Sequence, residues 1–239
     1  MKKTTLMFLF GFLAISLTFS QEIEKYRFPI APSDAEWKTN SYVERLKILN
    51  IEEETLKSLS NIQLIGACLD FIYTINLYAF NGLDEGYENV FSIFNGLREL
   101  HIRNDIGKDL IYFYSNMGID GFEGELDVYN EEFDLLKFTF YEVLLSREEI
   151  ISKMNQSVKD LLVDECVRKY RMKEECKQEF EGEPIFNELD KKLTLAILCR
   201  MILIDGDKLA NEQAKEFLLS RSFETASINN IISLSQELY

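Results

Sequence analysis

The sequence predicts an all-α fold, and two observations support that prediction. The chain has only three prolines, Pro29, Pro32 and Pro184, so no proline interrupts a helix between the last two. Apolar residues recur at spacings of three and four, whereas no segment sustains the period of two that is typical of a strand. With 46% hydrophobic and 28% charged residues, the composition is that of a chain that buries a core.

The amino-terminal residues 1–20 have the pattern of a secretory signal peptide. Two lysines precede an apolar run over 6–17, and the small residues Thr18 and Ser20 place the cleavage site before Gln21. An uncleaved membrane anchor is disfavoured, because the run is shorter than the roughly 20 residues that span a bilayer. We therefore expect an exported protein, periplasmic or extracellular, with no membrane span after cleavage. Its expected segments are a signal peptide over 1–20, an extended leader over 21–32 and a single all-helical domain over 33–239.

Three serine-based capping boxes mark expected helix starts, because each serine is followed three residues later by Glu or Gln. They are Ser33 with Glu36, Ser60 with Gln63 and Ser146 with Glu149.

Apolar stripes that run between such helix starts and the glycines at which helices end predict roughly ten helices. The most apolar stretches, 62–77 and 189–204, are expected to form buried helices. The charged segment 168–181 is expected to be a bend or an exposed connector before Gly182 and Pro184. The other helices are expected over 33–50, 90–97, 105–118, 133–144 and 150–167, with two shorter ones from Gly206 to the last residue.

Short consecutive helices joined by tight turns are typical of helical-hairpin arrays. We therefore expect an irregular α-α superhelix of the armadillo or HEAT kind, although exact sequence repeats are absent. A compact orthogonal helical bundle is the alternative.

Charge and composition exclude several classes of function. Lys and Arg number 26 against 41 Asp and Glu, a formal net charge of −15, which disfavours nucleic acid as a partner. The single histidine, His101, excludes sites built from two imidazoles, and it is expected to be a structural residue near a helix end. No cofactor is predicted, and the oligomeric state stays open.

The four cysteines raise the question of disulfides, because exported proteins meet oxidising conditions. Cys68 and Cys199 lie in the two most apolar stretches and are expected to be free, buried thiols. Cys166 and Cys176 can pair only if the chain turns between them, since ten residues of one helix separate their Cα atoms by about 15 Å.

Two acidic segments are candidates for binding a cation. Positions one, three, seven and twelve of a calcium-loop template correspond to Asp205, Asp207, Asn211 and Glu216. The template fails at position six, which requires glycine and here is Ala210; the simpler interpretation is that Asp207 caps a helix. A second acidic cluster, more commonly a solvated group of charges, comprises Asp120, Glu123, Glu125 and Asp127.

Aromatic residues near the leader have two interpretations. Tyr26, Phe28 and Trp37 could anchor the leader onto the domain or onto another molecule.

Two longer blocks of the sequence carry a resemblance. The first is 49–60 with Leu64, Cys68 and Leu69, and the second runs from Val90 to Gly107; a weaker one opens at 144–146. These blocks resemble an uncharacterised family of secreted all-helical proteins of Bacteroidota. The resemblance implies secretion and a helical fold, and it supplies no catalytic residue. After Cys68, where relatives tend to have Asn-Tyr-Pro, this chain has residues 70–72 as Asp-Phe-Ile, which predicts a helix that continues instead of kinking.

The sequence thus favours an exported helical binding or scaffold protein for a protein or peptide partner over an enzyme. The alternative is a carboxylate-dependent hydrolase that acts on envelope or host glycans, for which two carboxyl groups suffice. With 41 acidic residues, the sequence singles out no such pair.

Export predicts a defined mature amino terminus. Expressed in a bacterium with an outer membrane, the chain should be recovered outside the cytoplasm with an intact mass that corresponds to 21–239, within a few residues. Leu13→Arg places a charge inside the apolar run and should leave the precursor uncleaved. Recovery of the uncleaved wild-type chain in the membrane fraction would instead indicate an anchor.

Overall fold

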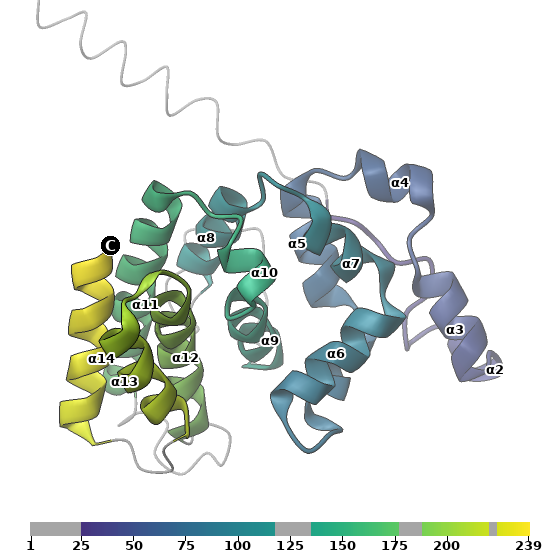
Figure 1. Cartoon of the computed structure of the whole chain (residues 1–239). Coiled ribbons are helices and arrows are strands. Elements are labelled where there is room, and N and C mark those ends of the chain that lie inside the picture. Colours follow the sequence, from purple (N-terminus) through teal and green to yellow (C-terminus); the bar gives the residue numbers. More distant parts are fainter. Residues whose placement is uncertain (1–24, 118–134, 177–187, 220–223) are drawn as a thin grey trace, which may run out of the picture.

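The computed structural model describes residues 25–117, 135–176, 188–219 and 224–239, and every regular element in them is helical (Figure 1). The all-α prediction is confirmed for these residues. The first elements are α2 (Ala35–Thr39), α3 (Tyr42–Leu49), α4 (Glu53–Ser58), α5 (Asn61–Asp70), the 3-10 helix η1 (Ile72–Tyr78), α6 (Leu83–Ile93), α7 (Asn95–Ile102) and α8 (Gly107–Asn116). The others are α9 (Leu135–Leu145), α10 (Glu148–Ile151), α11 (Gln156–Cys176), α12 (Glu188–Asp205), α13 (Lys208–Leu219) and α14 (Thr225–Leu238).

Helix α9 lies between two groups of helices. It packs against α5, α6 and η1 on one side and against α10 and α12 on the other, and α12 in turn contacts α11, α13 and α14. Figure 1 shows α2 to α7 and α11 to α14 at opposite ends of the molecule, with α9 and α10 between them. No helix in the described ranges is long and apolar enough to cross a membrane.

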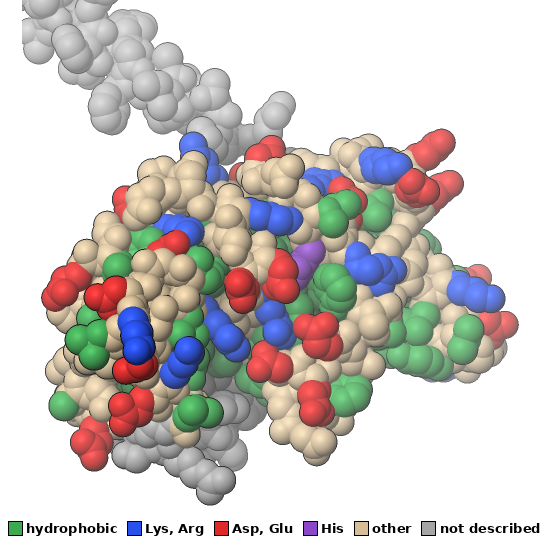
Figure 2. Space-filling view, viewed as in Figure 1, with side chains coloured by type: hydrophobic (Ala, Val, Ile, Leu, Met, Phe, Trp, Pro, Cys, Tyr) green, Lys and Arg blue, Asp and Glu red, His purple; other side chains and the backbone are tan. Residues whose placement is uncertain are grey.

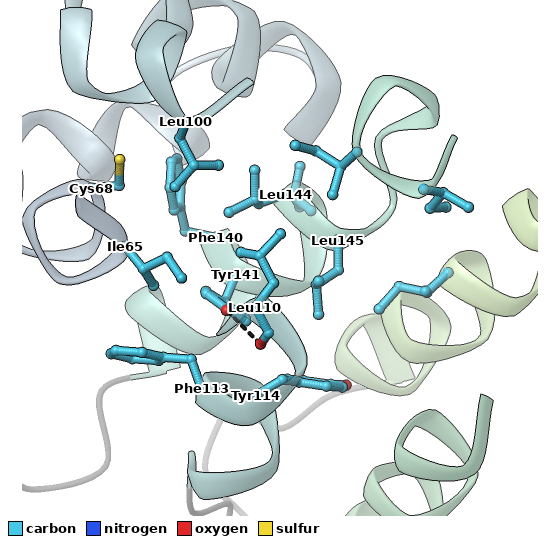
Figure 3. Packing of buried hydrophobic residues seen from close by; sticks show 14 of the residues in the cluster. Ile65, Cys68, Leu100, Leu110, Phe113, Tyr114, Phe140, Tyr141, Leu144 and Leu145 are labelled. Carbon is cyan, nitrogen blue, oxygen red and sulfur yellow. Dashed lines mark hydrogen bonds between the residues drawn. The ribbon is translucent and has the colours of Figure 1, made fainter. Parts of the chain in front are cut away.

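The core around α9 is built mainly from aromatic and aliphatic side chains (Figure 3). Phe140 and Tyr141 of α9 face Ile65 of α5 and Leu110 of α8, and all four are at most 1% exposed. The buried Tyr141 hydroxyl donates a hydrogen bond of 2.7 Å to the Leu110 carbonyl oxygen, which satisfies a polar group that would otherwise be costly to bury.

Two of the capping predictions concern the first helices. The box at Ser60 is confirmed: its hydroxyl accepts from the Gln63 N–H, and the Gln63 side chain accepts from the Ser60 N–H. The box at Ser33 is wrong. The N-cap of α2 is Asp34, whose carboxylate accepts from the Ala31 N–H instead.

The other predicted starts are displaced along the chain. The Ser146 hydroxyl donates to the Val143 carbonyl oxygen at the end of α9, and α10 begins after Arg147, so the predicted box at Ser146 does not form. The helix predicted to open at Asp105 begins at Gly107. Both helix starts lie within two residues of the predicted ones, which is the usual precision of a helix boundary.

The apolar stretch 62–77 was expected to be one helix, and this prediction is wrong beyond Asp70. Phe71 has an extended backbone, with φ −66° and ψ 114°, and its fully buried ring stacks on Phe94 with centroids 4.2 Å apart. The chain then continues as the 3-10 helix η1. The expectation of a helix that continues through residues 70–72 therefore fails, because the Phe71 ring is drawn into the core.

A pair of asparagines joins α3 to the junction of α6 and α7. The Asn50 side chain donates to the Ile93 carbonyl oxygen and accepts from the Asn95 N–H, while the Asn95 side chain accepts from the Ile51 N–H and donates to the Ile51 carbonyl oxygen. We call Asn50 and Asn95 the asparagine joint. It provides hydrogen-bond partners for backbone groups that have none within their own helices at the helix ends.

Helix α6 approaches η1 at a glycine. A Cβ atom at Gly86 would lie 2.2 Å from the Leu77 carbonyl oxygen, whereas a Cβ atom at Gly82 would meet nothing within 4 Å. Because the obstacle at Gly86 is backbone, it cannot rotate away as a side chain could.

We expect Gly86→Ala to lower the free energy of unfolding by about 1 to 3 kcal/mol, since α6 and η1 must separate. Gly82→Ala is the matched control and should cost less than about 1 kcal/mol, because alanine is only somewhat less favourable than glycine at the N-cap of a helix. Urea unfolding followed by circular dichroism measures both variants. Equal stability of the two would show that α6 and η1 are not closely packed.

Candidate functional site

The 3-10 helix η1 exposes a row of large apolar side chains. A 3-10 helix has three residues per turn, so residues three apart lie on one face. Ile72, Ile75 and Tyr78 are 38%, 54% and 47% exposed, whereas Thr74 and Leu77 on another face are buried. We call Ile72, Ile75, Tyr78 and the following Phe80, which is 44% exposed, the η1 strip.

Aromatic side chains extend the strip toward α2 and α3. Tyr73 of η1 stacks on Trp37 of α2 with ring centroids 6.0 Å apart, and Tyr42 of α3 meets it edge-on at 5.1 Å. The Arg45 guanidinium lies 4.7 Å from the centre of the Trp37 ring, at cation–π distance. Figure 2 shows hydrophobic side chains gathered on the surface over α2 and α3.

The leader itself packs onto the domain. Phe28 contacts Phe71 and Phe94 at centroid distances of 6.2 and 6.0 Å, and Tyr26 packs edge-on against Phe28. Of the two interpretations of these leader aromatics, the structure therefore supports anchoring onto the domain, and Trp37 belongs to the aromatic extension of the η1 strip.

A second candidate is a buried ionic cluster, which sequence reasoning missed. The Glu142 carboxylate of α9 is 0% exposed. Its Oε2 accepts from Lys173 Nζ at 2.7 Å, and its Oε1 accepts from the Tyr114 and Thr194 hydroxyls at 2.8 and 2.6 Å. These partners belong to α11, α8 and α12. The carboxylate therefore has donors from three helices, which compensate its removal from water.

Lys169 lies one turn before Lys173 on the same face of α11. Its side chain is 1% exposed; its ammonium donates to the Met117 carbonyl oxygen and lies 3.6 Å from the Glu165 carboxylate. Burial lowers the pKa of Lys169 to about 8, and the Glu165 charge only partly opposes that shift. Because the folded-state pKa lies below the unfolded value, folding disfavours the charged lysine, and this contribution improves stability as the pH rises through 8.

The prediction of a bend or exposed connector over 168–181 is therefore wrong for the residues that the structure describes. Helix α11 continues to Cys176, and Lys169 and Lys173 are buried in it. A signal was present in the sequence: Val158 and Leu162 start an apolar stripe whose helical spacing leads through Cys166 to both lysines.

Both oxygens of the Glu142 carboxylate are paired with protein donors, so we interpret the cluster as structural. A groove of about 340 Å³ between α11 and α14 is lined by other residues. They are Asp164, Val167, Arg168, Arg171, Met172, Glu175 and Gln236.

The candidate calcium ligands are engaged in protein contacts. Asp205 Oδ2 accepts from Lys159 Nζ at 2.5 Å and from the Tyr239 hydroxyl. Asp207 Oδ1 accepts from the Ala210 N–H, as expected of a helix cap, and the Asn211 side chain donates to the Gly206 carbonyl oxygen.

Glu216, the fourth of these candidates, is exposed on α13. Among the described residues, no group of three or more His, Cys, Asp or Glu side chains could hold a metal ion. The other acidic candidates, Asp120, Glu123, Glu125 and Asp127, lie outside the described residues.

Cys68, Cys166 and Cys199 are all buried in helices as free thiols. Cys68 and Cys199 are free and buried, as predicted, and burial raises the pKa of each thiol. Cys166 is also free and buried, and α11 runs without a break from Gln156 to Cys176. The turn that a Cys166–Cys176 disulfide requires is therefore absent, and no bridge forms.

His101 has the contacts of a structural histidine. Its Nε2 lies 2.6 Å from the Tyr87 hydroxyl, and its ring packs edge-on against Phe91. Burial lowers the pKa of His101 to about 4, so the imidazole is neutral at physiological pH.

A glycosidase needs a carboxyl group whose pKa is raised. In the described residues, the carboxyl groups whose pKa departs from its usual value all shift downward. Hydrogen bonds from Ser41 lower that of Glu44, and Lys57 lowers that of Glu53. For Asp205, burial raises the pKa, but hydrogen bonds from neighbouring side chains outweigh that effect.

Comparison with protein-family models found no match, and searches of curated proteins and of solved structures likewise found none. The interpretation of this chain therefore depends on its own residues.

The Glu142–Lys173 pair can be tested by stability. We expect Glu142→Gln to lower the free energy of unfolding by about 3 to 5 kcal/mol, because it removes the carboxylate that pairs with a buried ammonium. Adding Lys173→Met should recover much of that loss. The exposed Glu53–Lys57 pair provides the control, where Glu53→Gln should leave the free energy of unfolding almost unchanged, because solvent screens the pair. A Glu142→Gln variant as stable as the wild type would contradict the assignment.

Proposed function

We propose that this chain is an exported helical scaffold that binds a protein partner through the η1 strip. The observation that supports the proposal is the strip itself, four large apolar side chains each at least 38% exposed, continuous with the aromatic cluster of Trp37, Tyr42 and Tyr73. Exposed apolar groups in contact with one another favour burial against a partner.

The aromatic extension fits a binding role. Tyrosine and tryptophan side chains give large contact areas at a small cost in side-chain entropy, and together with arginine they dominate the energetics of many interfaces. Trp37, Tyr42 and Arg45 supply all three residue types beside the strip.

We further propose that the helices form an irregular superhelix of hairpins. Consecutive pairs such as η1 with α6, α6 with α7, and α12 with α13 pack on each other, as successive units of an array do. Such arrays present extended surfaces, which suits a scaffold. No observation in the described residues favours the alternative, a glycan hydrolase.

A comparison of variants tests the binding function. The tagged wild-type chain, together with Ile75→Asp, is used to capture proteins from envelope and extracellular extracts. We expect a protein that the wild type retains to be lost at least about tenfold with Ile75→Asp, because a charge would face the apolar partner.

Leu209→Asp is the matched control, since Leu209 is 64% exposed on α13, far along the chain from η1. It should retain the same protein as the wild type. A charge-matched acidic protein excludes capture by charge alone. Equal retention by Ile75→Asp and the wild type would overturn the role of the strip.

A further inference from the structure

We infer that the partner of the η1 strip is a second copy of this chain, bound through the same strip in a two-fold symmetric contact. The inference rests on the proposed function, because it names the partner of the same surface. Two features support it: the geometry of the strip, and the charges at its two ends.

The strip has a centre and two ends. With a rise of about 2 Å per residue, Ile72 and Tyr78 lie about 12 Å apart along η1, with Ile75 midway. If two copies align their η1 helices antiparallel about a two-fold axis, Ile75 of one copy meets Ile75 of the other. Ile72 of each copy then faces Tyr78 of the other, so that the same surface serves both partners.

One end of the strip is cationic. Tyr73, near the start of η1, contacts Trp37, and the Arg45 guanidinium covers the Trp37 ring and donates a hydrogen bond to the Asn40 carbonyl oxygen. Residues 25–50 contain five Lys or Arg against three Asp or Glu, in a chain with a net charge of −15. Lys38 and Lys47 on α2 and α3 are exposed cations, whereas Glu36 and Glu44 are exposed anions of the same helices, so that together with Arg45 the two helices carry a net charge of +1.

The other end is anionic. Tyr78 and Phe80 lead into the first turns of α6, which carry Asp84, Glu85 and Glu88. Arg147 approaches Asp84 at 3.1 Å and Glu88 at 3.8 Å, yet these side chains stay 74% and 65% exposed.

The antiparallel contact brings the cationic end of each copy to the anionic end of the other. A chain this acidic repels itself in most orientations, so local complementarity selects this one. A lipid surface fits less well, because a flat bilayer would meet both ends at once and attract only one of them.

Sedimentation velocity over a range of protein concentrations tests the inference. The wild type should associate into a dimer, and Ile75→Asp should raise the dimer dissociation constant at least about tenfold, because the two introduced carboxylates meet on the axis. Leu209→Asp should leave the dissociation constant unchanged. High salt should weaken the wild-type dimer, because screening reduces the attraction between the ends.

A charge exchange tests the pairing of the ends. Lys38→Glu with Lys47→Glu makes one end acidic, and Asp84→Lys with Glu85→Lys makes the other end basic. Each variant alone should dimerise at least about tenfold more weakly than the wild type, since like charges then face each other. A mixture of the two variants should form a heterodimer, because each altered end meets its complement.

A wild type that stays monomeric overturns this inference, and so does a dimer that Ile75→Asp leaves intact. Failure of the mixture to form a heterodimer overturns the antiparallel arrangement. The proposed function fails separately. A monomeric wild type that captures another protein through the strip refutes only the second copy, whereas loss of both strip-dependent capture and dimerisation refutes both.

Discussion

The Glu142 carboxylate is the interaction on which the arrangement of the central helices depends. It lies on α9 and accepts hydrogen bonds from Tyr114 of α8, Lys173 of α11 and Thr194 of α12. The hydrophobic effect that buries residues 138–145 of α9 is non-directional, so it does not by itself fix the rotation of the helix. A buried charge removes that freedom, because any displacement that separates it from its donors leaves it uncompensated. Three helices are thereby fixed around a fourth.

The parts of the fold that the sequence predicted are those that local chemistry decides. The capping box at Ser60 depends on residues three apart, and the burial of Cys68 and Cys199 follows from apolar stretches that contain them. The two largest failures involve contacts between distant segments. Phe71 ends α5 because its ring stacks on Phe94. Lys173 is buried because it pairs with Glu142, thirty-one residues earlier in the chain. Charged residues in sequence are expected in solvent, and only their position on the α11 stripe indicates otherwise.

The η1 strip could not be predicted from the sequence, because it also depends on a contact between distant segments. The apolar residues of 62–77 indicated a buried helix, because their number exceeds what a surface helix exposes. Residues 49–60 and 90–107 meet at the asparagine joint, where the side chains of Asn50 and Asn95 each hydrogen-bond to backbone groups of the other segment. These residues hold α3 against the junction of α6 and α7, so their role is structural.

The η1 strip exists only because the helix changes type at Phe71. In an α-helix, successive residues rotate by about 100°, so Ile72, Ile75 and Tyr78 would spread over about 120° of the surface. In a 3-10 helix they fall on one line, and Thr74 and Leu77 fall together on the buried side. The stacking of Phe71 on Phe94 thus decides both where α5 ends and which apolar side chains reach the solvent, and the same contact that completes the core creates the surface available to a partner.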